Sequence, residues 1–294
     1  MRIIPMPMHR SRVLLLTLIA LIAFAANSIL CRLAFERSGI DAASFTSIRL
    51  LSGALMLWLI VALRNDARGI GGSWPSAAAL FTYAAAFSFA YVSLPTGVGA
   101  LLLFGAVQAT MILAGLRDGE RMGGRQITGL VLALGGLGYL MLPGLSAPPL
   151  GGSLLMLAAG IAWGLYSLRG RGTADPIGAT AGNFLRAAPL GIGLSAAALP
   201  WLQADAVGAV YAMLSGALAS GAGYAVWYAA LRGLAATHAA TVQLGVPVIA
   251  AAGGTLLLDE PVTLRLAFAS VAILGGIALV VLGRSSASEP GKAP

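Results

Sequence analysis

The sequence predicts an all-α polytopic membrane protein of ten transmembrane helices, arranged as two inverted repeats of five helices. Three observations carry this prediction. The composition is too apolar for a soluble domain, ten apolar runs are long enough to cross a bilayer, and the last third of the chain repeats the end of its first half. A duplication with an odd number of spans per copy gives two oppositely oriented halves.

The composition indicates which solvent the chain meets. Hydrophobic residues make up 59% of the 294 residues and charged residues only 10%, and the mean hydropathy is +0.89. A soluble domain has about 25% charged residues. Because the apolar runs are continuous rather than alternating, and hydrocarbon offers no partner to exposed backbone groups, we expect the spans to be helical.

Ten runs come close to or exceed the about 20 residues that cross a bilayer. Short connections with turn-forming pairs, such as Pro143-Gly144 and Asp175-Pro176, separate them and leave no room for a soluble domain. The runs are residues 13–34, 45–63, 76–93, 96–116, 124–142, 150–168, 177–199, 206–230, 237–257 and 264–283.

An internal repeat with an offset of 140 residues divides the runs into two groups of five. We therefore expect residues 1–145 to form one five-helix repeat and residues 146–294 the other, with residues 284–294 as a short cytoplasmic tail. The matching residues are Glu120 with Glu260, Arg125 with Arg265, and 134–136 with 274–276.

Charge placement predicts the orientation, because Lys and Arg in short loops stay on the cytoplasmic side. With both termini inside, thirteen basic residues are cytoplasmic and three, Arg32, Arg37 and Arg265, lie outside. The loop near Glu120 holds three arginines and its counterpart near Glu260 holds one, which places these loops on opposite faces. The net charge of +8 then follows from topology and does not indicate nucleic-acid binding.

Two features of the first span carry less information. Arg12 before an apolar run is typical of a secretion signal, but cleavage would break the arrangement of five plus five spans, so we expect the span to be retained. Cys31 is the single cysteine, which excludes an internal disulfide and a thiolate metal site. The sequence has no cofactor, metal or nucleotide motif, and no enzymatic activity is expected.

Short motifs at equivalent places of the two halves resemble a known family. They are Gly119-Glu120-Arg121 and Leu258-Asp259-Glu260-Pro261 before the last span of each half, Pro247 in the ninth span and Arg49 in the second. With ten spans in two inverted fives, they resemble the EamA family of the drug/metabolite transporter superfamily. The resemblance implies a carrier of the bacterial inner membrane with a central cavity, which exports metabolites, often amino acids, including aromatic ones.

One position departs from the family pattern. Family members commonly carry a Trp-Gly pair in the first span, where this chain has Phe24-Ala25. The sixth span keeps the pattern as Trp163-Gly164. A substrate contact is therefore not carried over to Phe24.

Polar side chains inside the spans are candidates for substrate binding, because a polar group in hydrocarbon faces a cavity or a neighbouring helix. Asn27 interrupts an apolar face of the first span. In the fourth span Gln108 lies one turn from Phe104, so both point the same way. A cavity wall and a hydrogen bond between helices explain these residues about equally well.

Aromatic stripes give the second group of substrate-binding candidates. Trp163 and Tyr166 lie three residues apart in the sixth span, as do Tyr224 and Trp227 in the eighth. These faces can stack on an aromatic ring, whereas the alternative is the belt of Trp and Tyr at the membrane interface. We favour the cavity for them and the belt for Tyr228. For most of the stripe formed by Tyr83, Phe87 and Tyr91 we expect core packing.

The ninth span joins Gln243 to Pro247 across one turn. Proline removes a backbone donor and frees the carbonyl four residues earlier, so Gln243 is a substrate-binding candidate and Pro247 a hinge. Broken helices near the midplane are typical of transporter sites. The alternative is a static kink whose free carbonyl a neighbouring Ser or Thr satisfies.

Two arginines lie within the spans at equivalent places of the two halves. Arg49 is about 6 Å from the start of its span, so we expect it to reach the interface and to be structural. Arg186 is about 10 Å in, where it holds a carboxylate, gates the cytoplasmic mouth or, as we favour, is structural.

The functional prediction is a secondary transporter that exports amino acids or related metabolites by alternating access through an aromatic, neutral cavity. All ten acidic residues lie in loops or at span ends, so facilitated export is simpler than proton coupling. The alternatives are efflux of cationic or toxic compounds, which would favour a carboxylate in the cavity, and a scaffold or sensor without transport. The partners are a small-molecule substrate and membrane lipid. We expect a monomer, with a homodimer as the alternative.

Overall fold

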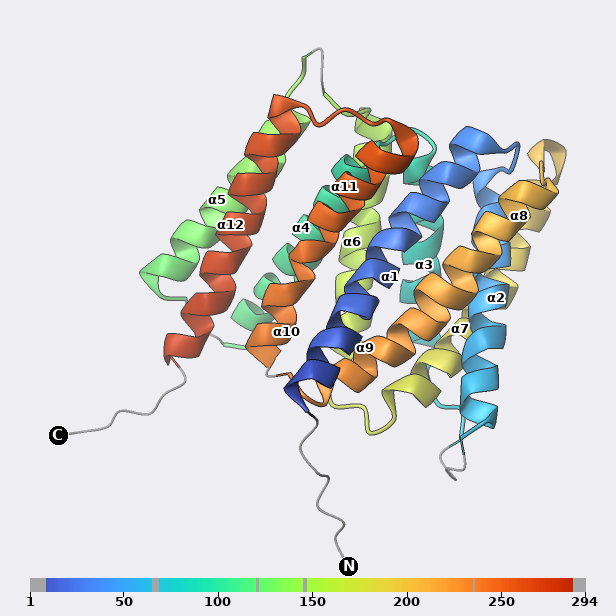
Figure 1. Cartoon of the computed structure of the whole chain (residues 1–294), viewed down its shortest axis with the longest axis horizontal. Coiled ribbons are helices and arrows are strands. Elements are labelled where there is room, and N and C mark those ends of the chain that lie inside the picture. The colour runs from blue at the N-terminus through green and yellow to red at the C-terminus, as the bar shows by residue number, and fades with distance from the viewer. Residues whose placement is uncertain (1–8, 65–68, 120–121, 145–146, 235, 288–294) are drawn as a thin grey trace, which may run out of the picture.

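The chain folds into a bundle of helices that run up and down along a common direction (Figure 1). The computed structural model describes residues 9–64, 69–119, 122–144, 147–234 and 236–287, and within these ranges no strand occurs. The prediction of an all-α protein is confirmed. Glu120 and Arg121, which carry part of the internal repeat, lie outside the described residues.

Eight of the predicted runs are single helices in the described ranges. Asp41 begins α2 by accepting hydrogen bonds from the N–H groups of Ala43 and Ser44, and Ser73 begins α3 in the same way through Ser76. The eight helices are α1 (Arg10–Arg37), α2 (Ala42–Ala62), α3 (Trp74–Tyr91), α4 (Thr96–Arg117), α5 (Gly124–Met141), α6 (Leu150–Gly170), α7 (Pro176–Ala197) and α12 (Leu264–Ala287).

The other two runs are interrupted. The eighth consists of α8 (Ala206–Met213), the π-helical η2 (Leu214–Ala222) and α9 (Gly223–Leu231), and the short η1 (Leu199–Trp201) precedes it. The ninth is divided into α10 (Ala236–Gln243) and α11 (Gly245–Leu258). The break at Leu244 lies three residues before Pro247, as expected where proline removes a helical hydrogen bond.

The π-helical segment η2 packs closely against α2. A Cβ on Gly216 would lie 2.1 Å from the carbonyl oxygen of Arg49, so only glycine permits this approach. π-helical turns are rare and occur frequently at functional sites. The sequence of η2 is rich in small residues, such as Ser215, Gly216 and Ala219, which permit close approach of two helices.

Seven helical segments in the described part of the chain are long and apolar enough to cross a membrane. The predicted runs in α3, α5 and α7 are helical but fall below the same hydropathy, because they contain polar residues or many glycines. The chain is thus a multi-pass membrane protein. That all ten segments cross the bilayer stays a prediction.

The helices pack in pairs that connect the two halves. α5 packs along α12, α2 along α7, and α4 along α11. α3 packs along α6. The corresponding contact is formed by η2 and α9, the equivalents of α3, which pack along α1. The pair of α5 and α12 forms one side of the bundle, and α2, α7 and α8 lie at the other side (Figure 1).

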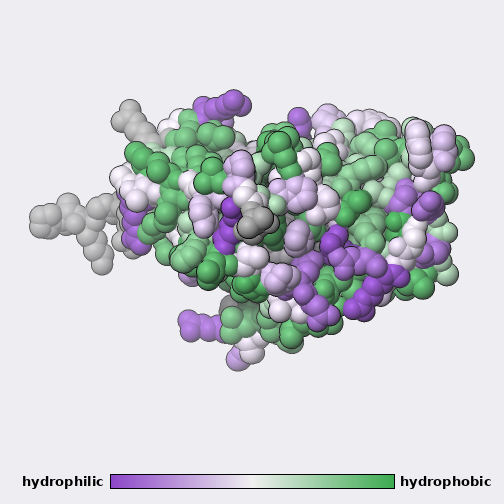
Figure 2. Space-filling model, turned by 90° about the horizontal axis from the view of Figure 1, so that it is seen from above, coloured by the Kyte–Doolittle hydropathy of each residue, from purple (hydrophilic) through white to green (hydrophobic). Residues whose placement is uncertain are grey.

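The two ends of the bundle differ in charge. The connections after α2, α4, α6 and α9 lie at the lower end in Figure 1, which we call the arginine-rich end. The connections after α1, α3, α7 and α11 lie at the upper end, which we call the opposite end. Seen onto this opposite end, hydrophilic residues form patches among hydrophobic ones (Figure 2).

Candidate functional site: a central aromatic cavity

A cavity of about 960 Å³ lies between helices of both halves. Its wall is drawn from α1, α3, α4, α6, α7, α9, α10 and α12. At the arginine-rich end it includes residues of two connections, Gly72 and Ser73 after α2, and Arg171 to Thr173 after α6. Among the described connections of the opposite end, none contributes a lining residue. The cavity therefore opens towards the arginine-rich end.

Aromatic rings from three helices meet in the cavity wall. Trp163 of α6 stacks on Tyr224 of α9, with ring centroids 5.3 Å apart and planes 19° apart. It also stacks on Tyr166 at 5.2 Å, and Tyr83 of α3 lies against it at 4.8 Å. Offset stacked and tilted pairs at such distances are favourable arrangements. The result is a continuous aromatic surface in the wall of the cavity.

The remaining predicted contacts mostly line the same cavity. Trp227 of α9 packs edge-on against Phe24 of α1 at 5.8 Å, and Gln108 is buried in α4. The structure thus brings together seven of the eight predicted substrate-binding residues, and their contact with a substrate stays a prediction. The seven are Phe104, Gln108, Trp163, Tyr166, Tyr224, Trp227 and Gln243.

Asn27 is the exception among the eight. Its side chain is buried behind the wall, where Nδ2 donates to the Tyr83 hydroxyl at 3.2 Å and Oδ1 accepts from the Ser215 hydroxyl at 2.5 Å. Of the two interpretations given by the sequence, the structure shows a hydrogen bond between helices. Asn27 holds α1 against α3 and η2, and it orients a residue that does line the cavity.

The two residues predicted to act in gating lie outside the cavity wall. Arg186 donates to the carbonyl oxygens of Gly71 at 2.7 Å and Gly182 at 2.9 Å, and so ties the connection after α2 to α7. Pro247 is buried near the start of α11, after the break at Leu244. A hinge or gate at these positions stays a prediction.

Sequence reasoning missed four aromatic residues of the site, one of which is Phe24 of α1. Tyr83 and Phe87 line the cavity, although core packing was expected for most of their stripe. Tyr91 does pack in the core, where its hydroxyl donates to the carbonyl oxygen of Thr96 at 3.2 Å. Tyr228 also lines the cavity and bonds the Thr180 hydroxyl at 3.3 Å. The expected place of Tyr228 in an interfacial belt is wrong, because α9 turns this side chain towards α7.

Arg49 is a further correction. Its side chain is only 1% exposed, so it does not reach the interface as its place near the start of a span predicted. The long side chain extends inward to α3, where its Nη2 donates a hydrogen bond to the Tyr83 hydroxyl at 3.0 Å. Counting residues from a span end gave its depth but not its direction.

A layer of buried contacts closes the bundle at the opposite end. Glu260, in the connection after α11, accepts hydrogen bonds from the Thr96 N–H at 2.7 Å and the Thr96 hydroxyl at 3.1 Å. Arg32 of α1 lies 3.4 Å from the same carboxylate and donates to the carbonyl oxygen of Tyr91 at 3.1 Å. One carboxylate thus joins α1, α4 and the connection before α12.

Two helix caps fasten neighbouring connections at this end. Asp41 caps α2 and accepts from the Gln203 N–H at 2.8 Å, while Asp205 caps α8 and accepts from the Gly39 N–H. Burial raises the pKa of Asp41, but hydrogen bonds from Ser44, Gln203 and Ala43 outweigh it and the pKa lies below its usual range. Backbone N–H groups lower the pKa of Asp205 in the same direction.

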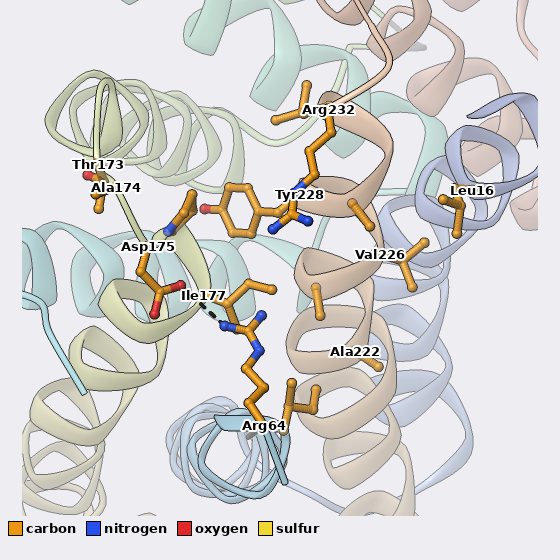
Figure 3. A pocket seen from close by; sticks show the side chains of 15 residues that line it. Leu16, Arg64, Thr173, Ala174, Asp175, Ile177, Ala222, Val226, Tyr228 and Arg232 are labelled. Carbon is orange, nitrogen blue, oxygen red and sulfur yellow. Dashed lines mark hydrogen bonds and ion pairs between the residues drawn. The ribbon is translucent and has the colours of Figure 1, made fainter. Parts of the chain in front are cut away.

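A second groove, of about 910 Å³, adjoins the cavity at the arginine-rich end. Tyr228 lines both spaces, and the Arg64 to Asp175 ion pair at 3.2 Å crosses the groove between α2 and α7 (Figure 3). Arg232 lies beside Tyr228 (Figure 3). In the part of the chain that the structure describes, no cluster of His, Cys, Asp and Glu could hold a metal ion.

Comparisons with known proteins agree with this architecture. The model of the EamA-like transporter family matches residues 150–282. A Pseudomonas aeruginosa protein, described only as uncharacterized, is 59% identical over 94% of this chain and 97% of its own length. A crystal structure of a protein superposes on 93% of this chain and 98% of its own chain with a TM-score of 0.66 at 18% identity, which shows the fold alone.

Proposed function

Because this chain belongs to the EamA-like transporter family, we propose that it exports amino acids or related small metabolites across the bacterial cytoplasmic membrane as a secondary carrier. The observation that carries the proposal is the central cavity, which is aromatic in its wall and opens towards one end only. Its volume of about 960 Å³ falls within the range of small-molecule sites, about 300 to 1,000 Å³.

The distribution of arginines supports a cavity that faces the cytoplasm. The arginine-rich end includes the described residues Arg10, Arg12, Arg64, Arg117, Arg125, Arg169, Arg171 and Arg232, whereas the opposite end carries Arg32, Arg37 and Arg265. Basic residues of short loops stay on the cytoplasmic side. Both termini are then cytoplasmic, and the structure corresponds to the inward-facing state of an exporter, ready to accept substrate.

The pairing of helices supports two inverted repeats of five spans. If each of the first five segments is exchanged with its counterpart among the last five, α5 takes the place of α12 and α2 takes the place of α7. The same pairs of segments remain in contact after this exchange. Such exchange symmetry between halves of opposite orientation is the basis of alternating access, in which one group of helices rocks against the other around a fixed site.

The aromatic surface supports amino acids with large apolar side chains as substrates. Trp163, Tyr166 and Tyr224 stack on one another in the cavity wall and form an aromatic surface against which an aromatic side chain can pack. No Asp or Glu is among the described lining residues, which favours this proposal over the efflux of cationic compounds. Facilitated export down a concentration gradient requires no proton-carrying group in the cavity.

Counterflow in proteoliposomes tests the proposal. Vesicles with the full chain and unlabelled tryptophan inside should accumulate labelled tryptophan above empty vesicles, and more than they accumulate a cationic dye. Trp163→Ala should reduce tryptophan counterflow by up to about tenfold, because a lost ring contact costs about 0.5 to 1.5 kcal/mol and 1.4 kcal/mol corresponds to about that factor. Trp201→Ala is the matched control, since Trp201 is 74% exposed outside the cavity.

The outcomes separate the candidate functions. Dye accumulation without amino-acid flux would favour the efflux alternative. Flux of neither compound above empty vesicles would contradict transport and favour a scaffold or sensor. An equal loss of tryptophan counterflow in Trp163→Ala and Trp201→Ala would contradict substrate binding in the cavity.

A further inference from the structure

A buried guanidinium lies directly behind the cavity wall. Arg49 of α2 is packed on the rings of Phe87 and Tyr83, with its central carbon 4.7 Å and 5.1 Å from the two centroids. Both rings line the cavity. Cation and ring attract each other at these distances, so the positive charge is fixed against the far side of the aromatic wall.

This charge has no counter-ion in the described part of the protein. The ion pairs found there involve Arg32 and Arg64, and none involves Arg49. The Nη1 atom of Arg49 also has no hydrogen-bond partner. A buried charge without an opposite charge is costly, and inside a membrane such a residue marks a functional site by default. The arrangement is therefore suited to a ligand that brings negative charge.

Tyr83 lies between this charge and the cavity, because it lines the cavity and its hydroxyl is bonded to Arg49. Its oxygen accepts hydrogen bonds from Arg49 Nη2 at 3.0 Å and from Asn27 Nδ2 at 3.2 Å. A hydroxyl has two acceptor lone pairs and one hydrogen to donate. With both lone pairs engaged, the hydrogen is left to donate, and no hydrogen bond from it is found among the described residues.

We propose that Tyr83, with Arg49 behind it, is the recognition point for the carboxylate of the substrate. Tyr83 donates its hydroxyl hydrogen to the carboxylate, and Arg49 acts as a positioning residue that orients and polarises this hydroxyl. Hydrogen bonds to a charged acceptor are about twice as strong as neutral ones. This inference rests on the proposed transport function and narrows its substrates to molecules that carry an anionic group.

The position of Tyr83 beside Trp163 fits a compact amphiphilic substrate. Their ring centroids are 4.8 Å apart, so a carboxylate at the Tyr83 hydroxyl and an aromatic side chain on the Trp163 surface belong to neighbouring parts of one site. Asn27, which was predicted to bind substrate, contributes here by holding the Tyr83 oxygen.

Tryptophan and tryptophanamide form the matched probe pair, because the amide carries a neutral carboxamide in place of the carboxylate and is otherwise identical. Both compounds are compared in full-length protein by counterflow and by the rise in unfolding temperature on binding. We expect the wild type to prefer tryptophan by about tenfold or more. Tyr83→Phe should bring this ratio close to one, because the variant no longer has a hydroxyl hydrogen to donate to the carboxylate.

Arg49 is tested by two variants. Arg49→Gln should lower the preference as Tyr83→Phe does, and Arg49→Lys, which keeps the charge, should restore part of it. A residue that merely ties α2 to α3 would change both compounds equally and leave the ratio unmoved. Tyr139→Phe is the control, because Tyr139 is 41% exposed on α5. Should Arg49→Gln fail to fold, Tyr83→Phe decides the question.

The two readouts separate this inference from transport itself. Equal preference for the two compounds in the wild type, or an unchanged ratio in Tyr83→Phe, would overturn the carboxylate site while leaving transport intact. Absence of all flux would contradict transport. In that case binding decides, since tryptophan should still raise the unfolding temperature of the wild type more than that of Tyr83→Phe, and equal rises would overturn the inference.

Discussion

The two ends of the bundle are held together by different chemistry. At the opposite end, the carboxylates of Glu260, Asp41 and Asp205 accept hydrogen bonds from backbone N–H groups of other connections. At the arginine-rich end, the ion pair between Arg64 and Asp175 joins α2 to α7, with side chains 28% and 18% exposed. Bonds to fixed backbone donors need an ordered partner, whereas exposed ion pairs are weak and adaptable.

This difference explains which end is closed in the structure. A carboxylate on backbone donors holds two connections in one geometry, so opening must break several charge-assisted hydrogen bonds together. The arginine-rich end needs no such layer, because the cavity already reaches it. If the carrier alternates between two states as we propose, changes at the opposite end should redistribute these states, while changes at the arginine-rich end should do so much less.

The largest effect is expected from Glu260→Gln. Removing the charge weakens the bonds to Thr96 and removes the partly buried ionic partner of Arg32, which costs about 1.5 to 3 kcal/mol. The opposite end should open more often. Cys31 is the single cysteine, is fully buried and stands next to Arg32, so its labelling by a membrane-impermeant thiol reagent should rise at least about tenfold.

Glu36→Gln is the matched control for this change. Glu36 also pairs with Arg32, but its side chain is 37% exposed, and such pairs contribute about 0 to 1 kcal/mol. Labelling of Cys31 in this variant should stay within about threefold of the wild type. Equal labelling in the two variants would show that Glu260 does not keep this end closed.

A smaller effect is expected from Asp41→Ala. The variant loses the cap of α2 and the bond to the Gln203 N–H, which costs about 1 kcal/mol and lowers the unfolding temperature by about 2 °C. Asp118→Ala is the control, because Asp118 is an exposed residue at the other end of the bundle. Equal shifts would mean that the cap does not stabilise the opposite end in particular.

The same residue predicts a dependence on pH. The folded-state pKa of Asp41 lies below its usual value of 3.8, so the stabilisation is present above about pH 4 and is lost as the pH falls through the folded pKa. The difference in unfolding temperature between the wild type and Asp41→Ala, measured from pH 7 to pH 3, should therefore shrink as the pH falls below about 4. A difference that stays constant over this range would contradict the assigned ionisation.

The sequence predicted the helical runs and much of the cavity wall because both depend on local signals. Hydropathy set the spans, and aromatic spacing in α6 and α9 placed Trp163 and Tyr224 on faces that meet. It did not separate Tyr83 and Phe87 from Tyr91, since all three share one helix face. The cavity ends between Phe87 and Tyr91, and that depth is set by packing against α4, which a single stripe does not encode.

Two other features depend on partners far away in the chain. Small residues in η2 fit a regular α-helix as well as a π-helix, and the choice follows from the close contact of Gly216 with α2. Arg49 was placed near a span end by residue counting, but its direction depends on the rings of Tyr83 and Phe87 on another helix. Such long-range contacts are absent from local periodicity.

The smallest effect is expected from Arg64→Gln at the arginine-rich end. The ion pair with Asp175 at 3.2 Å is partly exposed, so it contributes about 0.2 to 1 kcal/mol and weakens with salt. Counterflow and Cys31 labelling should both change by less than about threefold, and a cycle with Asp175→Asn should give a coupling in the same range. A tenfold change in either measurement would show that this end is held as firmly as the opposite one. The two ends would then be held with similar strength although only one is open. The shape of the cavity, and not the strength of the contacts, would have to explain why the arginine-rich end is the open one.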